Sequence, residues 1–236
     1  MPDAPFLEIA KRAAPLRQQV EDAVRQAIVD GHLQPGQRLT ERELTDRMGV
    51  SRTLVREALR QLESESLITV IPNRGAIVRE LTAVEVQYLY DIRAVLEGLA
   101  ARLFTLNADE KKMKLAAKAA ADTIAAYKAA DPTRALEAKN RFYSILVSGA
   151  GSESLSTMLA TLHTRVRQWR AIGITHPQRS PSRAQEAIGG LSAIWSAIRK
   201  RDAAAAESAT RDEARRGAAE LMRLLAVAPV KQVAQK

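Results

Sequence analysis

The apolar positions of the first third of the chain follow a helical period that is interrupted at regular points. From Leu16 to Asp30 they recur every three or four residues, and Gly31 ends this predicted helix. A second helix begins at Thr40, because Thr40 and Glu43 have the spacing of a capping box. Ser51 can cap a third helix, which is predicted to run to about Ser64.

The third predicted helix has two distinct faces. Its inner face would consist of Val55, Ala58, Leu59 and Leu62, and its outer face carries Arg52, Arg56 and Arg60. Two β-prone runs follow, at Ile68–Ile71 and Ala76–Arg79, and the turn Pro72–Gly75 joins them as a hairpin. Three helices followed by a small hairpin predict a winged helix-turn-helix.

The character of the chain changes after Leu81, because every later segment is predicted to be helical. We therefore expect a mostly α protein: an N-terminal winged helix-turn-helix with a two-stranded wing, then a C-terminal all-α bundle of about six helices. We expect a flexible arm at residues 1–14 and a DNA-binding domain at residues 15–81. A helical domain for effector binding and dimerisation should follow at residues 82–228, with a frayed tail at residues 229–236.

Composition narrows the class of protein. There is no cysteine, which excludes disulfides and thiolate metal sites. The longest nearly uncharged apolar stretch, Ile188–Ile198, is too short to span a membrane, and the N-terminus has no signal-peptide pattern. We therefore expect a cytoplasmic protein without a membrane partner.

The net charge of +9 suggests a nucleic-acid-binding protein, but its distribution along the chain does not support that inference. Residues 1–81 hold 12 Lys and Arg and 12 Asp and Glu, so the whole excess lies downstream of the predicted reader. The case for DNA must rest on local placement.

That placement concerns the start of the third helix, which would enter a major groove with its N-terminal residues first. Arg52 and Arg56 can donate forked hydrogen bonds to guanine. The full set of expected DNA contacts is Arg42, Ser51, Arg52, Thr53, Arg56, Asn73 and Arg74. From periodicity alone, a solvated arginine face remains an alternative.

Several spaced blocks resemble the GntR family of bacterial regulators. They are Leu33–Leu39, Glu43-Leu44, Gly49–Leu59 and Pro72–Gly75. The resemblance implies a homodimer on a palindromic double-stranded operator. One departure is Ser66, where the family usually has glycine at the end of the reading helix.

The downstream half resembles the FCD effector domain of the FadR-type branch, on the segments Tyr90–Ala100, Asn140–Phe142 and Ala197–Asp202. Many members of that branch hold a divalent metal with one Asp or Asn and three His. The matching positions here are Lys139, Tyr143, Leu191 and Glu213, so we predict no metal and no other cofactor.

Two hypotheses follow for these positions. If Glu213 faces Lys139 across the bundle, the pair replaces the lost metal. Alternatively, the cationic and aromatic residues bind an anionic effector directly. The effector-site candidates are Arg93, Lys139, Tyr143, Arg165 and Glu213, and the alternative is that they are surface or helix-pairing residues.

The expected function is a sequence-specific transcription repressor that is released by a small organic acid bound in the helical domain. No base–nucleophile pair or phosphate loop indicates an enzyme. Two alternatives remain open: a repressor without effector control, whose pocket has degenerated, and a non-specific basic DNA-binding protein.

Overall fold

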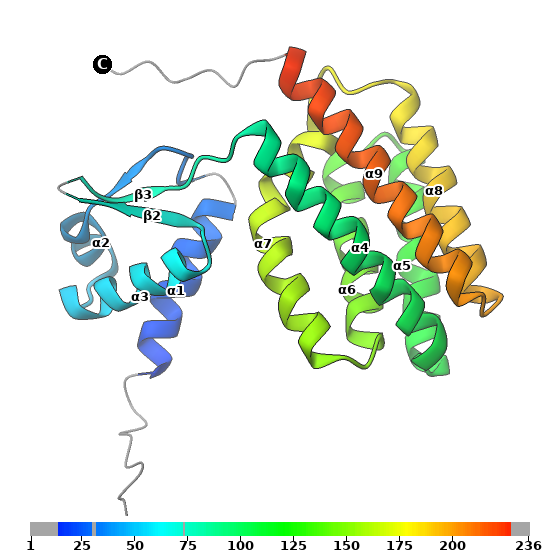
Figure 1. The fold of residues 1–236 in the computed structure, drawn as a ribbon, viewed down its shortest axis with the longest axis horizontal. Helices are drawn as coiled ribbons and strands as arrows, with labels where there is room; N and C mark the ends of the chain where they lie inside the picture. Colours follow the sequence, from blue (N-terminus) through cyan, green and yellow to red (C-terminus); the bar gives the residue numbers. More distant parts are fainter. Residues whose placement is uncertain (1–13, 30–31, 73, 228–236) are drawn as a thin grey trace, which may run out of the picture. The chain divides into compact units, whose positions relative to one another are not determined.

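The structure, a computed structural model, describes residues 14–29, 32–72 and 74–227 and divides into two compact units, Met1–Glu80 and Leu81–Lys236 (Figure 1). Most of the expected arm at 1–14, the tail at 229–236 and the predicted contact residue Asn73 lie outside the described residues. Ala14, which we expected in the arm, is instead the first residue of a helix.

The part of the first unit that the structure describes contains three helices and a small sheet. The helices are α1 (Ala14–Val29), α2 (Glu41–Met48) and α3 (Arg52–Ser64), and the strands are β1 (Arg38–Leu39), β2 (Ile68–Ile71) and β3 (Gly75–Val78). All strand pairs are antiparallel, in the order β1-β3-β2. The expected two-stranded wing is therefore present, with β1 as a third strand that is too short to show alternation in the sequence.

Local side-chain caps fix the helix boundaries in this unit. The hydroxyl of Thr40 accepts a hydrogen bond from the backbone N–H of Glu43, and the hydroxyl of Ser51 accepts one from Leu54. Gly49 ends α2 with φ of 65°, a left-handed conformation that suits glycine. These caps produce the tight turn that places α3 against α1.

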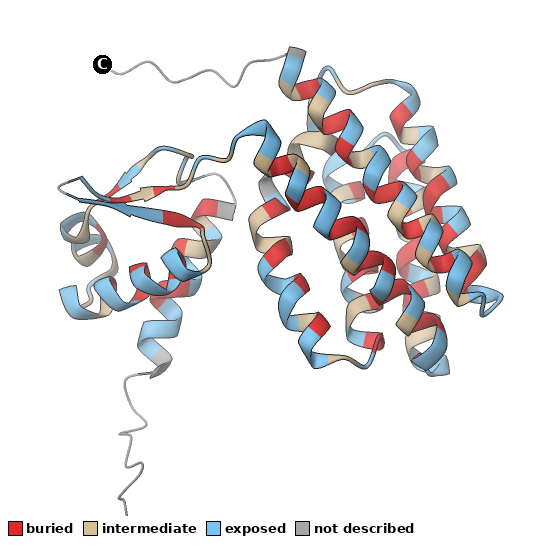
Figure 2. Cartoon of the chain, viewed as in Figure 1, coloured by how far each residue is buried: buried red, intermediate tan, exposed pale blue. Residues whose placement is uncertain are grey.

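The apolar face of α3 anchors the first unit. Val55 and Leu62 are fully buried and pack in one cluster with residues of α1, α2 and the sheet. Because this face is held in the core, the opposite face of α3 is presented to solvent, as Figure 2 shows.

Within residues 81–227, the second unit is a bundle of six helices, as the sequence predicted. They are α4 (Ala83–Asn107), α5 (Glu110–Lys128), α6 (Pro132–Gly149), α7 (Glu153–Thr175), α8 (Ser182–Arg199) and α9 (Ala203–Val227). Thr82 and Glu85 form a reciprocal capping box at the start of α4. None of the helices in the described part of the chain is long and apolar enough to cross a membrane.

Helix α4 is central to this bundle, since it packs against α6, α7, α8 and α9. Two apolar clusters fill the interior, one around Phe104, Phe142 and Ile198 and the other around Leu159, Val166 and Leu221. Between the apolar residues, α4, α6, α7, α8 and α9 each bring charged side chains into the interior.

Candidate DNA-binding face and buried charge cluster

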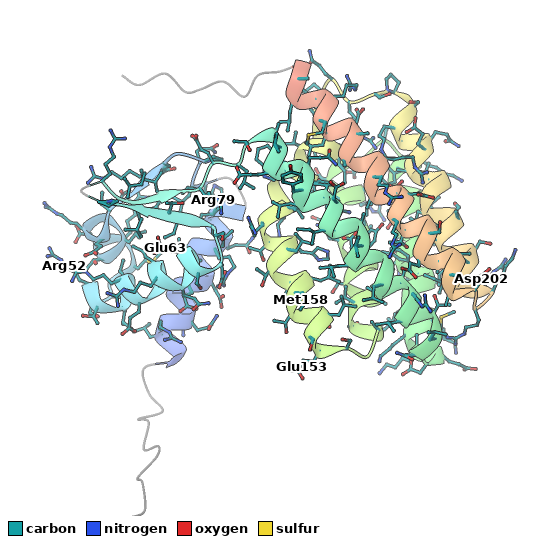
Figure 3. All side chains as sticks on the ribbon, viewed as in Figure 1. Arg52, Glu63, Arg79, Glu153, Met158 and Asp202 are labelled. Carbon is teal, nitrogen blue, oxygen red and sulfur yellow. The ribbon has the colours of Figure 1, made fainter. Side chains whose placement is uncertain are left out.

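The N-terminal end of α3 exposes the residues that the sequence singled out. Ser51, Arg52, Thr53 and Arg56 are all exposed, and Arg52 projects away from the ribbon (Figure 3). The free N–H groups of the first turn point the same way and favour an anion such as a phosphate. The arrangement fits a helix that enters a groove with its N-terminus.

The arginines on this face differ in how they are held. The Nε atom of Arg56 donates to Glu41 Oε1 at 2.7 Å, and Arg42 lies 3.7 Å from Asp46. Among the ion pairs of the described residues, none involves Arg52. Arg52 is thus ready to bind, whereas Arg56 must exchange Glu41 for a base or phosphate.

An open groove of about 620 Å³ lies between the start of α2, the outer face of α3 and the sheet. Arg38, Arg56 and Arg60 line it. We had not included Arg38 or Arg60 among the contact residues. The four-residue spacing of Arg52, Arg56 and Arg60 places Arg60 on the same helix face and could have indicated it. Arg38 reaches the groove only because β1 pairs with β3.

The β2–β3 hairpin carries the last predicted contact residue, Arg74. Its side chain is exposed, and its backbone N–H donates to the Ile71 carbonyl at 3.0 Å. Gly75 follows with φ of 81°, which glycine adopts without strain. The turn presents Arg74 at the edge of the sheet.

The second unit holds a buried ion pair between two of the predicted effector residues. Lys139 Nζ on α6 lies 2.7 Å from Glu213 Oε1 on α9, and both side chains are buried. Arg183 on α8 donates to the same oxygen at 2.8 Å. Burial favours the neutral acid, but the charges of Lys139 and Arg183 outweigh it and hold the pKa of Glu213 below its usual value.

A second buried carboxylate lies close to this pair. Glu97 on α4 accepts hydrogen bonds from Arg93 at 2.9 Å and Arg170 at 2.7 Å, and His163 Nε2 lies 2.8 Å away. Burial opposes its ionisation, yet the two guanidinium groups and His163 keep the pKa of Glu97 well below the usual range. Glu97 is therefore a buried anion that ties α4 to α7.

Tyr143 lies between the two carboxylate groups. The guanidinium carbons of Arg93 and Arg170 lie 5.9 Å and 5.6 Å from its ring centroid, within the range of cation–π contacts. Its hydroxyl is buried and has no hydrogen-bond partner among the described residues. Burial, reinforced by Glu97 and Glu213, raises the pKa of Tyr143, so the hydroxyl remains a donor.

A small cavity of about 30 Å³ opens at this cluster, which is room for only a few water molecules. Its lining holds five cationic side chains and one carboxylate, namely Arg93, Lys139, Arg170, Arg179, Arg183 and Glu213. Individual nitrogens of Arg170, Arg179 and Arg183 are buried without a partner among the described residues. The lining thus has an excess of positive charge and of donors.

Sequence reasoning found part of this cluster. The structure brings Arg93, Lys139 and Glu213 to the cavity lining with Tyr143 beside it, while Arg165 is not among the lining residues. Sequence reasoning missed Glu97, His163, Arg170, Arg179 and Arg183. The four-residue spacing of Arg93 and Glu97 within a buried face was an available signal, whereas the other residues meet only through helix packing.

The donor set here does not fit a divalent metal. Of the four positions implied by the family resemblance, only Glu213 has an anionic oxygen, and the ammonium of Lys139 already occupies its coordination side. In the described part of the chain, no group of three or more His, Asp or Glu is placed to hold a metal ion. The metal-free site stays a prediction that this geometry favours.

Comparisons with known proteins bear on both units. The family described as bacterial regulatory proteins, gntR family, matches residues 16–78, and the FCD domain matches residues 88–215. The HTH-type transcriptional regulator YdhC of Bacillus subtilis (strain 168) is 28% identical over 176 residues, covering 74% of this chain and 79% of that protein. The HTH-type transcriptional repressor GlaR of Escherichia coli (strain K12) is 26% identical over 190 residues, covering 78% and 86%.

Solved structures share the fold. E. coli McbR/YncC has a TM-score of 0.73 at 22% identity and covers 89% of this chain and 98% of its own. A transcriptional regulator GntR from Rhodococcus sp. RHA1 has a TM-score of 0.69 at 25% identity and covers 88% and 97%. The family matches fall on the winged helix-turn-helix and on the helical bundle, in that order. The chain therefore belongs to the gntR family of bacterial regulatory proteins, in the branch with an FCD domain, whose members are transcriptional regulators and not enzymes.

Proposed function

We propose that this regulator is a cytoplasmic repressor that binds a palindromic operator as a homodimer and is released by a small organic acid. The observation that carries the effector proposal is the cavity lined by five cationic side chains. Glu97 and Glu213 are shared by four of these cations, so positive charge remains in excess around the space. Because a buried cation without its own counter-charge is costly, this excess favours an anionic occupant.

The chemistry of the lining narrows the class of effector. Arginine N–H groups form strong hydrogen bonds to carboxylates, and one nitrogen each of Arg170 and Arg183 is buried without a partner among the described residues. The Tyr143 hydroxyl supplies a neutral donor. These groups suit a compact carboxylic acid, with a hydroxyl or second carboxylate that reaches Tyr143.

The size of the cavity gives the effector a mechanical consequence. About 30 Å³ does not admit an organic acid, so the effector must displace the Glu213 carboxylate from Lys139 and Arg183. Glu213 lies on α9, whereas Lys139 and Arg183 lie on α6 and α8. If the effector takes Glu213's place beside Lys139 and Arg183, α9 is released and can shift relative to α6 and α8. The effector would then bind one arrangement of the bundle more tightly than the other, and this difference in affinity would shift the population between them.

On the DNA side, two reading helices of a homodimer would lie about 34 Å apart, one turn of the duplex. Arg52 and Arg56 would read bases, while Arg42 and the hairpin would contact the backbone. A ligand-dependent change in the bundle would alter that spacing. The relatives include a protein named as a repressor, GlaR, which supports repression as the outcome.

Selection of bound sequences from a random duplex pool tests the DNA part of the proposal. The expected result is one enriched palindrome, bound about a thousandfold or more above random DNA. Addition of mono-, di- and tricarboxylates should then release it in at least one case. Absence of any enriched sequence would overturn the proposal.

Tyr143→Phe tests the effector part with little risk to the fold, because the hydroxyl that it removes has no partner here. Affinity for the releasing acid should fall about tenfold, the loss of one hydrogen bond of roughly 1.4 kcal/mol. Thr157→Val, which removes an exposed hydroxyl on α7 outside the cavity lining, is the matched control. Equal affinities of both variants for the acid would remove Tyr143 from the site.

A second candidate is a repressor without effector control, and the small cavity favours it. In that case Glu213 is the permanent counter-ion of Lys139 and Arg183, and no acid in the pools would release the operator. A non-specific basic DNA-binding protein is disfavoured, since residues 1–81 carry equal numbers of acidic and basic side chains.

A further inference from the structure

Helix α4 is apolar on both of its long faces. One face is buried within the bundle and includes Val86, Leu89, Ala101 and Phe104. The opposite face also carries large apolar residues, although it is exposed: Val84, Tyr88, Ile92, Val95, Leu99 and Leu106. Tyr88 is 63% exposed and Ile92 and Val95 are each 50% exposed. An exposed helix face that carries this many large apolar side chains normally contacts another surface.

The exposed residues form a regular seam. Tyr88, Ile92, Val95, Leu99 and Leu106 follow the alternating four- and three-residue steps of a coiled-coil seam, with Arg102 at the one polar position. Scattered surface apolar residues need no explanation, but a stripe along five turns of one helix with a single polar position marks an interaction site.

We propose that a second copy of this chain covers this seam, with the two α4 helices antiparallel. The seam is self-complementary in that direction: Tyr88 faces the partner's Leu106, Val95 faces the partner's Leu99, and Ile92 faces the aliphatic stem of the partner's Arg102. A twofold axis then passes beside position 97, and the same patch serves both copies, as an isologous interface requires.

Charges at the edge of the seam favour the antiparallel direction. Asp91 accepts a hydrogen bond from the side-chain amide of Gln87 and has no cationic partner among the described residues. Arg102 is half exposed and pairs with Glu207 at 3.3 Å. Antiparallel helices bring Asp91 beside the partner's Arg102, whereas parallel helices would bring like charges together.

The seam and the buried charge cluster share one helix. Arg93 and Glu97 lie on the buried face of α4, directly opposite Ile92, Val95 and Leu99. The two effector sites of a dimer would therefore lie back to back, one on each side of the twofold axis. This inference rests on the homodimer of the proposed function and assigns its interface.

Sedimentation equilibrium of the full chain provides the test. Ile92→Asp and Val95→Asp should each weaken dimerisation at least about 100-fold, because a carboxylate would be buried without a partner. Leu115→Asp on α5 and Met158→Asp on α7 are matched controls at exposed positions outside the seam, and should leave the dimer intact. Circular dichroism checks that every variant keeps its helical content.

The absence of cysteine allows the direction to be tested by cross-linking. A chain with Val95→Cys mixed with a chain with Leu99→Cys should be joined efficiently by a short bismaleimide. Tyr88→Cys alone should not cross-link, since antiparallel helices place the two copies of position 88 about 27 Å apart along the axis. Efficient Tyr88→Cys cross-linking would overturn the antiparallel direction.

The outcomes separate the interface from the function. A dimer that survives Ile92→Asp and Val95→Asp would overturn this interface and leave the homodimer in place through another surface. The same dimer would survive these substitutions if another part of the chain, and not a second copy, covered the seam. A wild-type protein that remains monomeric in solution and on DNA would overturn both the interface and the homodimer.

Discussion

Lys139 and Glu213, 74 residues apart in the chain, meet at 2.7 Å inside the helical bundle. The pair joins α6 to α9 at two of the four positions that the family resemblance implies for metal ligands. Arg183 donates to the same oxygen, and Arg216 lies 3.5 Å from the other carboxylate oxygen, so that one buried carboxylate pairs with three cations.

The stability of the second unit should depend unequally on the members of this group. Glu213→Gln should lower the free energy of unfolding by about 3–5 kcal/mol, because it leaves two buried cations facing each other. Lys139→Met should have a smaller effect, since Arg183 still pairs with Glu213. Urea unfolding followed by tryptophan fluorescence measures both, because Trp169 and Trp195 both lie in this unit. Asp212→Asn on the exposed side of α9 is the control, and an equal effect of all three would contradict the assignment.

Acidification should destabilise the second unit in two stages. Burial lowers the pKa of His163, although Glu97 opposes the shift, so the unfolded chain binds a proton there at a higher pH than the folded chain does. Stability is therefore full above about pH 6.5 and falls below it. The pKa values of Glu97 and Glu213 are also depressed in the folded state, which adds a further loss below about pH 4.5.

His163→Gln isolates the first stage. The variant should show a flatter dependence of unfolding free energy on pH below about pH 6.5, while the loss below about pH 4.5 remains. Urea titrations at a series of pH values, with tryptophan fluorescence as the signal, measure the slope. A variant slope as steep as that of the wild type would show that His163 does not carry this stage.

The chain just after α3 contains a residue with a strained backbone conformation, and a substitution can remove that strain. Ser66 adopts φ of 59°, and the N–H of Leu67 bonds back to the Leu62 carbonyl across it. Ser66→Gly should stabilise the first unit by about 1 kcal/mol, because glycine adopts this conformation without steric cost. Ser64→Gly, two residues earlier in the helix, should have the opposite sign. Calorimetry measures both, and a shared sign would refute the explanation.

Much of the first unit was predictable because its signals are local. The caps at Thr40 and Ser51 and the glycine turn at Gly49 each act over a few residues, and the structure confirms them. The pairing of β2 with β3 confirms the hairpin. Strand β1 was not predictable, since two residues show no periodicity and its pairing with β3 is a long-range event.

The charge cluster was only partly predictable for the same reason. Family spacing placed Lys139 and Glu213 at related positions, and the helical period places Glu97 one turn from Arg93. Arg170 and Arg183 reach the cluster only because α7 and α8 pack beside α4 and α9. No pattern within either helix distinguishes them from surface arginines such as Arg167 and Arg199.

The arginines of the DNA-binding face should differ in what they read. Arg52→Ala should cost about 1–3 kcal/mol on the selected operator and relax base preference, because Arg52 projects freely from the start of α3. Arg42→Ala should weaken all sequences alike and reduce the salt slope by about one. Arg199→Ala in the second unit is the control. An equal loss on all sequences would reassign Arg52 to phosphate contact.

Fluorescence anisotropy of the full chain at moderate ionic strength, with the selected operator and its scrambled duplex in parallel, measures whether α3 reads sequence. We expect a preference of about a thousandfold or more for the operator, which shrinks in Arg52→Ala. Equal affinity for both duplexes would contradict the claim that α3 reads sequence.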